Sequence, residues 1–200
     1  MSQVEKSVDV DVPVRTAYNQ WTQFEEFPRF MEGVEEVRQL DDQRLHWRAT
    51  IGGKEEEWDA VIVEQSPDLR LAWRSTSGAE NAGAVTFQPL SERQTRVHLT
   101  LTYTPEGMIE KAGDALGVVA GRVEGDLQRF KEFVESRGAE TGAWRGEIHG
   151  QRVERGDGGS TVRERWASGA GHPGPPPLPR HHTHHPRHAT DTNAVRERPP

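Results

Sequence analysis

The segment from Thr104 to Gly138 has the pattern of one long amphipathic helix. Thr104 and Pro105 are typical of a helix start, because a hydroxyl caps the first turn and proline suits the first helical position. Gly138 is typical of a helix end, where the chain often adopts a left-handed conformation. Between them, apolar residues recur at spacings of three and four, which predicts one apolar stripe. These residues are Ile109, Ala112, Leu116, Val119, Val123, Leu127, Phe130 and Val134.

A helix of roughly 32 residues spans about 48 Å, whereas an average globular helix has about 11–12 residues. Because its apolar stripe runs the whole length, this helix requires one large apolar surface to pack against. The preceding part of the chain offers such a surface, since alternating residues predict a strand at 3–12 and six more strands after it. Two short helical segments, 14–21 and 24–31, lie between the first strand and the others.

The clearest hairpin of the sequence has a two-residue turn at Gly52 and Gly53, between two alternating segments. With that turn length, Trp47 lies directly opposite Trp58. We therefore expect the two tryptophans to form a cross-strand pair on one face of the sheet. Glu56 shares this face and lies closer to the turn.

Strands joined by short turns predict an antiparallel meander. A long helix across one face of that sheet buries both apolar surfaces. We therefore expect an α+β domain, in which a curved antiparallel sheet of about six to seven strands wraps around a long C-terminal helix, with two short helices after the first strand. Because one helix need not fill all the space over so large a sheet, an interior cavity is also expected. Ligand sites are typically concave and mostly apolar.

The composition argues against several classes of protein. Residues 1–138 carry 16 Lys and Arg against 25 Asp and Glu, a formal charge of −9, so no nucleic-acid partner is expected. The chain has no cysteine, which excludes disulfides, thiolate nucleophiles and Cys-ligated metals. We expect no integral membrane segment and a cytoplasmic location, because the N-terminus lacks an apolar signal region and no 18-residue apolar run occurs.

Certain segments carry a resemblance to a known family: residues 10–14 followed by Ala17, Tyr18 and Trp21; residues 24–31 with Val34 and Val37; residues 57–60 after a double glycine; residues 71–73; and Arg129 with Phe130. In these the chain resembles the START-like (SRPBCC) superfamily, whose shape is called a helix-grip. It is most similar to the polyketide cyclase/dehydrase branch, which includes coenzyme Q-binding START domains. The resemblance covers about residues 2–138. It implies a hydrophobic small-molecule pocket between sheet and helix, and it brings no fixed catalytic triad.

Ligand-binding residues are expected on the inner face of the sheet, at one mouth of the cavity and on the helix that covers it. Trp and Tyr side chains can offer a polar handle within an apolar wall. Ordinary core packing is the alternative role for each of these residues. The candidates are Phe30, Met31, Trp47, Glu56, Trp58, Trp73, Phe87, Leu101, Tyr103, Met108 and Leu116.

Few residues are candidates for proton transfer. Glu56 falls on the apolar face, where a raised pKa would make it a polar anchor or a general acid or base; a solvated position beyond the edge of the core is the alternative. Tyr103 is the second candidate. Alternation directs His46 and His98 outward, so we expect no metal site and no cofactor. No catalytic sequence motif is present.

The leading functional hypothesis is the binding of a hydrophobic small molecule of lipid, quinone or polyketide type. One alternative is a cyclase or dehydratase enzyme acting on a polyketide-like substrate. A third possibility is association with ribosomes, as in a related branch of the superfamily. The acidic domain disfavours it, because RNA contact requires cationic residues.

We expect three parts: a helix-grip domain at 1–138, a short docking segment or linker at 139–150, and a disordered tail at 151–200. Trp144 makes the middle segment a candidate for packing back onto the domain. The tail is rich in Gly, Pro, Arg and His and lacks periodic apolar residues. Its deletion is therefore expected to leave the melting temperature and ligand binding unchanged.

Overall fold

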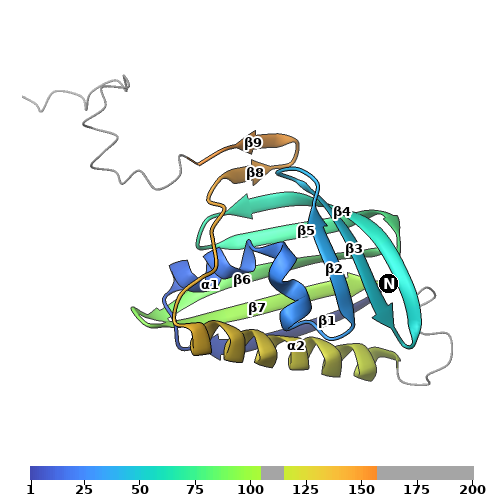
Figure 1. Cartoon of the computed structure of the whole chain (residues 1–200), viewed down its shortest axis with the longest axis horizontal. Helices are drawn as coiled ribbons and strands as arrows, with labels where there is room; N and C mark the ends of the chain where they lie inside the picture. The colour runs from blue at the N-terminus through green and yellow to red at the C-terminus, as the bar shows by residue number, and fades with distance from the viewer. Residues whose placement is uncertain (105–114, 157–200) are drawn as a thin grey trace, which may run out of the picture. The chain divides into compact units, whose positions relative to one another are not determined.

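The computed structural model describes residues 1–104 and 115–156. Its elements are β1 Ser2–Val10, α1 Val14–Trp21, the 3-10 helix η1 Phe24–Arg29, β2 Val34–Gln39, β3 Arg44–Ile51, β4 Lys54–Ser66, β5 Arg70–Gly78, β6 Asn81–Ser91, β7 Gln94–Tyr103, α2 Ala115–Arg137, β8 Glu147–His149 and β9 Arg152–Glu154. The described strands form one antiparallel sheet of nine, seven of which follow the order β1-β7-β6-β5-β4-β3-β2, while β8 and β9 join it beside β4. The long helix α2 packs along β1 (Figure 1). The predicted α+β helix-grip architecture is confirmed.

The hairpin of β3 and β4 has the predicted register. Gly52 and Gly53 both have positive φ, 60° and 82°, as a tight hairpin turn with two left-handed residues requires. Trp47 and Trp58 are paired across the strands, and their rings stack with centroids 5.5 Å apart and planes 11° apart. This hairpin therefore presents a flat aromatic surface on the inner face of the sheet.

From Val119 onward, α2 buries the apolar stripe predicted from its spacing, whereas Leu116 of the same stripe is 49% exposed. Val119, Val123, Leu127, Phe130 and Val134 are all buried. Gly138 has a φ of 67°, and its N–H donates to the carbonyl oxygen of Val134 at 3.2 Å, so it ends the helix as expected. The predicted start of the helix at 104–106 falls largely outside the described residues.

The C-terminal half of α2 is held by an aromatic core. Phe130 meets Trp21 edge to face, with ring centroids 4.9 Å apart, and meets Phe30 in the same way at 5.3 Å. Phe27 contacts both Trp21 and Phe30. Because α1, η1 and the residue after η1 supply these partners, this segment fills the space between the sheet and the C-terminal half of α2.

The chain continues past α2 into a small hairpin that sequence patterns did not predict. β8 pairs with the end of β4 and with β9, and Ile148 of β8 is 0% exposed. The predicted boundary at residue 150 falls on the turn of this hairpin, where Gly150 has a φ of 63°. Residues 151–156 therefore pack with the domain, whereas the rest of the predicted tail lies outside the described residues.

Side chains fasten the segment that connects α2 to β8. Arg145 binds Asp68 through two hydrogen bonds of 2.9 and 2.7 Å, and its guanidinium lies over the ring of Tyr18. Gln20, which is fully buried, exchanges two hydrogen bonds with Thr141. Burial raises the pKa of the Tyr18 hydroxyl to about 12. These contacts make residues 139–149 an integral part of the folded unit.

Two absences bear on function. In the regions 1–104 and 115–156, no helix is long and apolar enough to cross a membrane. Within the same regions, no cluster of three or more His, Asp or Glu side chains is arranged to hold a metal ion.

Candidate functional site

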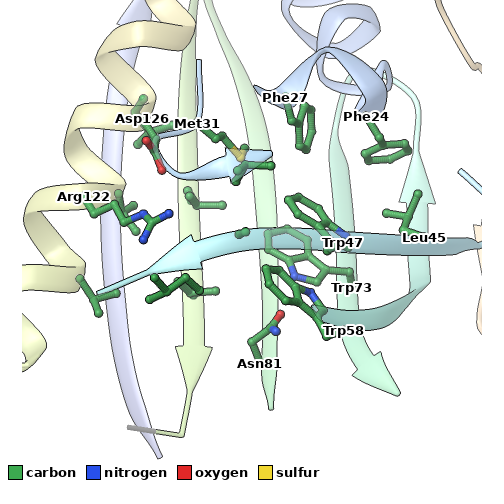
Figure 2. Close-up of a pocket in the computed structure, with 18 of the residues that line it drawn as sticks. Phe24, Phe27, Met31, Leu45, Trp47, Trp58, Trp73, Asn81, Arg122 and Asp126 are labelled. Carbon is green, nitrogen blue, oxygen red and sulfur yellow. The ribbon is translucent and has the colours of Figure 1, made fainter. Parts of the chain in front are cut away.

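A cavity of about 150 Å³ lies between the inner face of the sheet, η1 and α2. Figure 2 shows its labelled side chains converging on one space from these elements. The sheet contributes Leu45, Trp47, Trp58, Trp73 and Leu101 among others, η1 contributes Phe24 and Phe27, and α2 contributes Val119, Val123 and Leu127. The helix thus covers the sheet here without filling the space beneath it.

Three indoles form the sheet side of the cavity. Trp47 and Trp58 are stacked on each other, and Phe27 packs against Trp47 at 5.7 Å between centroids. Trp73, from β5, lies beside them (Figure 2). The indole Nε1 of Trp47 is buried and has no hydrogen-bond partner among the residues described. This wall therefore combines flat apolar surfaces with one unsatisfied donor.

The α2 side of the cavity carries two side chains of opposite charge, Arg122 and Asp126, each of which bonds to other residues. In Figure 2 both side chains project from the helix, opposite the three tryptophans. Asp126 accepts a hydrogen bond of 2.8 Å from the backbone N–H of Glu32, and Arg122 donates to the carbonyl oxygen of the same residue. These two side chains therefore tie the turn after η1 to α2.

Arg129 strengthens this connection. Its Nε donates to the carbonyl oxygen of Phe30 at 2.8 Å, and its Nη2 pairs with Asp126. Burial nevertheless raises the pKa of Asp126 above its usual value, because desolvation outweighs the bonds from Glu32 and Arg129. The cavity wall thus holds a carboxyl group that accepts a proton more readily than an exposed aspartate.

Sequence patterns did not predict Arg122 or Asp126. A signal was available, since both lie within one turn of Val119, Val123 and Leu127 and so border the apolar stripe. Charged residues at such positions usually extend to solvent. Only the turn that approaches α2 from η1 encloses them here.

Five of the predicted ligand-binding residues line the cavity, and the other predicted residues that the structure describes do not. Those in the wall are Met31, Trp47, Trp58, Trp73 and Leu101. Phe30 and Phe87 are buried in the core instead, which is the ordinary packing role named above as the alternative for each. Met108 lies outside the described residues. Leu116 has the spacing of the apolar stripe but lies near the first described residues of α2; it is 49% exposed and lies outside the wall.

The two predicted proton-transfer residues also lie outside the cavity wall. The carboxylate of Glu56 forms an ion pair of 3.0 Å with Lys54 at the hairpin turn, and its side chain is 18% exposed. Its cross-strand neighbour Ala49 and the turn-proximal Ile51 do border the cavity, whereas the Glu56 carboxylate pairs with Lys54 instead. Tyr103 is buried opposite Ser2, and its hydroxyl has no hydrogen-bond partner within the described part of the chain.

Asp126→Asn is expected to change the pH dependence of stability. A raised folded-state pKa means that the folded protein holds this proton more tightly than the unfolded chain does. The resulting stabilisation is complete below the ordinary value of 3.8 and is lost as the pH rises through the folded-state pKa. The free energy of unfolding of the wild type, minus that of D126N, should therefore fall from about pH 4 upward. Urea denaturation at several pH values measures it; a difference that rises with pH would contradict the assignment.

Comparisons with known proteins agree with this geometry. The model of the family described as "Polyketide cyclase / dehydrase and lipid transport" matches residues 10–132. An uncharacterised 17.2 kDa protein of Streptomyces lincolnensis is 52% identical over 149 residues, which make up 74% of this chain and 99% of that protein.

Two solved structures have a similar fold. DR_A0006 from Deinococcus radiodurans is 29% identical, with a TM-score of 0.54, over 68% of this chain and 99% of its own. The Zhui aromatase/cyclase from Streptomyces sp. R1128 is 17% identical, with a TM-score of 0.58, over 71% of this chain and 98% of its own. Because the Zhui aromatase/cyclase is only 17% identical, its likeness to this chain shows the fold alone.

Proposed function

This chain belongs to the polyketide cyclase/dehydrase and lipid transport family, and from that membership we propose that it binds a hydrophobic small molecule of lipid, quinone or polyketide type. The single observation that supports this most is the cavity of about 150 Å³ beneath α2. Protein interiors are close-packed, with few voids larger than a water molecule. A space of this size among large aromatic side chains is therefore a candidate site rather than a packing defect.

The polar groups of the cavity indicate how such a ligand would lie. Its apolar part would contact the indoles of Trp47, Trp58 and Trp73, which offer large flat surfaces. A hydrogen-bond acceptor on the ligand would face Arg122 or satisfy the Nε1 of Trp47, whose proton has no partner in the described regions. A molecule with one oxygen substituent on an apolar body fits this distribution better than a pure hydrocarbon does.

The test fills the cavity from the helix side. Val119→Phe places a ring where the 7% exposed Val119 lines the cavity, whereas Val118→Phe changes the neighbouring valine, which is 54% exposed and outside the wall. Calorimetric titration with 4-ethylphenol and with decanoate measures binding. We expect Val119→Phe to weaken binding at least about tenfold, since about 1.4 kcal/mol of lost contact has that effect, and Val118→Phe to leave it unchanged.

Two results would overturn the proposal. One is a wild-type protein that binds neither probe and carries no small molecule in native mass spectrometry. The other is equal binding by the two valine variants, provided that both retain the wild-type circular dichroism spectrum. That result would place the bound probe outside the cavity.

Catalysis is the second candidate function, and Asp126 is the observation that favours it. A half-buried carboxyl group with a raised pKa on a ligand-sized cavity is suited to general acid–base chemistry. The reaction would be cyclisation of a poly-β-ketone chain followed by the loss of water. Mass spectrometry of a poly-β-ketone thioester incubated with the protein would detect the loss of water. D126N should then abolish turnover while the substrate still binds, and equal product from D126N would exclude the role.

A further inference from the structure

A glycine in the middle of a strand determines where one wall of the cavity lies. Gly83 of β6 pairs with Trp73 on one side and with Leu101 on the other. Residues paired directly across antiparallel strands share one face of the sheet, and Trp73 and Leu101 both line the cavity. Gly83 therefore lies on the inner face, between two wall residues.

The indole of Trp73 occupies the space that a side chain at position 83 would need. A Cβ atom added to Gly83 would lie 2.4 Å from Cζ2 and 2.7 Å from Cη2 of Trp73, and 2.8 Å from the carbonyl oxygen of Thr100. Carbon atoms in normal contact are about 3.5–4.0 Å apart. The ring thus packs directly on the bare backbone of β6.

Backbone conformation does not explain this glycine. Gly83 is absent from the glycines with positive φ, so its backbone angles are open to other residues. A glycine inside a strand weakens the sheet unless it permits a close approach. The close approach here is that of Trp73, whose indole contacts both core clusters of the domain and the cavity.

We propose that Gly83 is a specificity-determining residue: by letting the Trp73 indole lie directly against the strand backbone, it sets the depth of the cavity and restricts the ligand to a flat ring system. A dry apolar cavity of about 150 Å³ is large enough for benzene. The cavity here has a volume of about 150 Å³, so displacement of one indole by a methyl group would remove a large share of it. This inference rests on the proposed function, because it assigns a role to the wall of the same cavity.

The experiment is a double-mutant cycle on the full chain with two probes of different ring size, 4-ethylphenol and 2-naphthol. The proteins are the wild type, Gly83→Ala, Trp73→Phe and the double variant. Gly121→Ala is the matched control, since a Cβ at Gly121 meets no atom within 4 Å. Calorimetric titration gives the dissociation constants, and near-ultraviolet circular dichroism reports the packing of the indoles.

We expect Gly83→Ala to weaken binding of 2-naphthol at least about tenfold, and more than it weakens binding of 4-ethylphenol, because the displaced indole excludes the larger ring first. Trp73→Phe should improve the affinity for 2-naphthol, relative to that for 4-ethylphenol, at least about threefold. In the double variant, the smaller phenyl ring leaves room for the methyl group, so most of the loss should be reversed. Gly121→Ala should bind both probes as the wild type does.

A merely structural role for Gly83 would lower stability without changing the ratio of the two affinities. An unchanged ratio in Gly83→Ala would overturn the inference, as would a double variant that binds no better than Gly83→Ala. If Gly83→Ala does not fold, the test passes to Trp73→Phe. An unchanged ratio of its affinities for 2-naphthol and 4-ethylphenol would then count against the inference. A wild type that binds neither ring probe but binds decanoate would reject the ring specificity alone. A wild type that binds none of the three probes and carries no small molecule in native mass spectrometry would reject the proposed function itself.

Discussion

A chain that ends at Gly138 is expected to lose on the order of 4–6 kcal/mol of unfolding free energy, a large part of the 5–15 kcal/mol typical of a domain. This truncation removes Ile148, which is 0% exposed, and burying such a side chain contributes roughly 1.5–3 kcal/mol. It also removes both partners of the buried Gln20 side chain and the Arg145 guanidinium bound to Asp68. A buried polar group left unpaired costs about 1–3 kcal/mol.

Urea denaturation followed by tryptophan fluorescence measures this loss. A chain that ends at Gly156 is the control, because it keeps every contact described here and should unfold at the same urea concentration as the full chain. Ile148→Ala separates the apolar part of the effect, with an expected cost of about 2–5 kcal/mol. Equal stability of the two truncated chains would show that residues 139–156 contribute nothing to the folded unit, as a simple linker would.

Phe130→Ala is expected to destabilise the protein by about 3–5 kcal/mol, the usual range for removal of a fully buried phenylalanine. Phe130 is completely buried and contacts Trp21 and Phe30 edge to face. It is the residue through which α2 meets both α1 and the segment after η1. Its loss would leave a cavity in the aromatic core and loosen the helix that covers the ligand cavity.

Phe133→Ala is the matched control for Phe130→Ala. Phe133 is on the same helix but is only partly buried, with its ring beside Phe30 and beneath the guanidinium of Arg137. Its removal should cost less than half as much, because solvent can reach the space that it leaves. Similar unfolding midpoints for the two variants would mean that the burial of Phe130 does not hold α2 to the sheet.

The hairpin of β3 and β4 illustrates what could be predicted from the sequence. Two consecutive glycines permit the left-handed turn, and alternation then leaves one register that buries the apolar residues. The sequence therefore predicts that Trp47 lies opposite Trp58, and the structure has them paired. The end of α2 at Gly138 was predictable for a similar reason, since its cap depends on neighbouring residues only.

The cavity wall was predicted only in part. Trp47, Trp58 and Trp73 share one face by alternation, so their presence in the wall followed from local patterns. Tyr103 and Glu56 were placed on the same basis, but they lie outside the wall, because alternation assigns a residue to a face and does not say which side chains on that face reach the cavity. Arg122 and Asp126 were missed, because their burial depends on a turn about ninety residues earlier in the chain.

The β8–β9 hairpin was missed for another physical reason. Each of its strands has only three residues, which is too short for an alternating pattern to be recognised. β8 forms because β4 extends to Ser66, beyond the pairing with β3, and so offers a free edge. An exposed strand edge is a ready template for a further strand.

Local patterns in this chain thus specified the order of its strands and helices, the register of its central hairpin and the apolar face of α2. Each of these depends on residues that are close in sequence, where turn chemistry and hydrophobic period act directly. Packing between distant segments decided the rest: the volume left beneath α2, the two charged side chains that face it, and the C-terminal hairpin on β4. The burial of a charge and the formation of a three-residue strand both depend on neighbours that only the folded chain brings together.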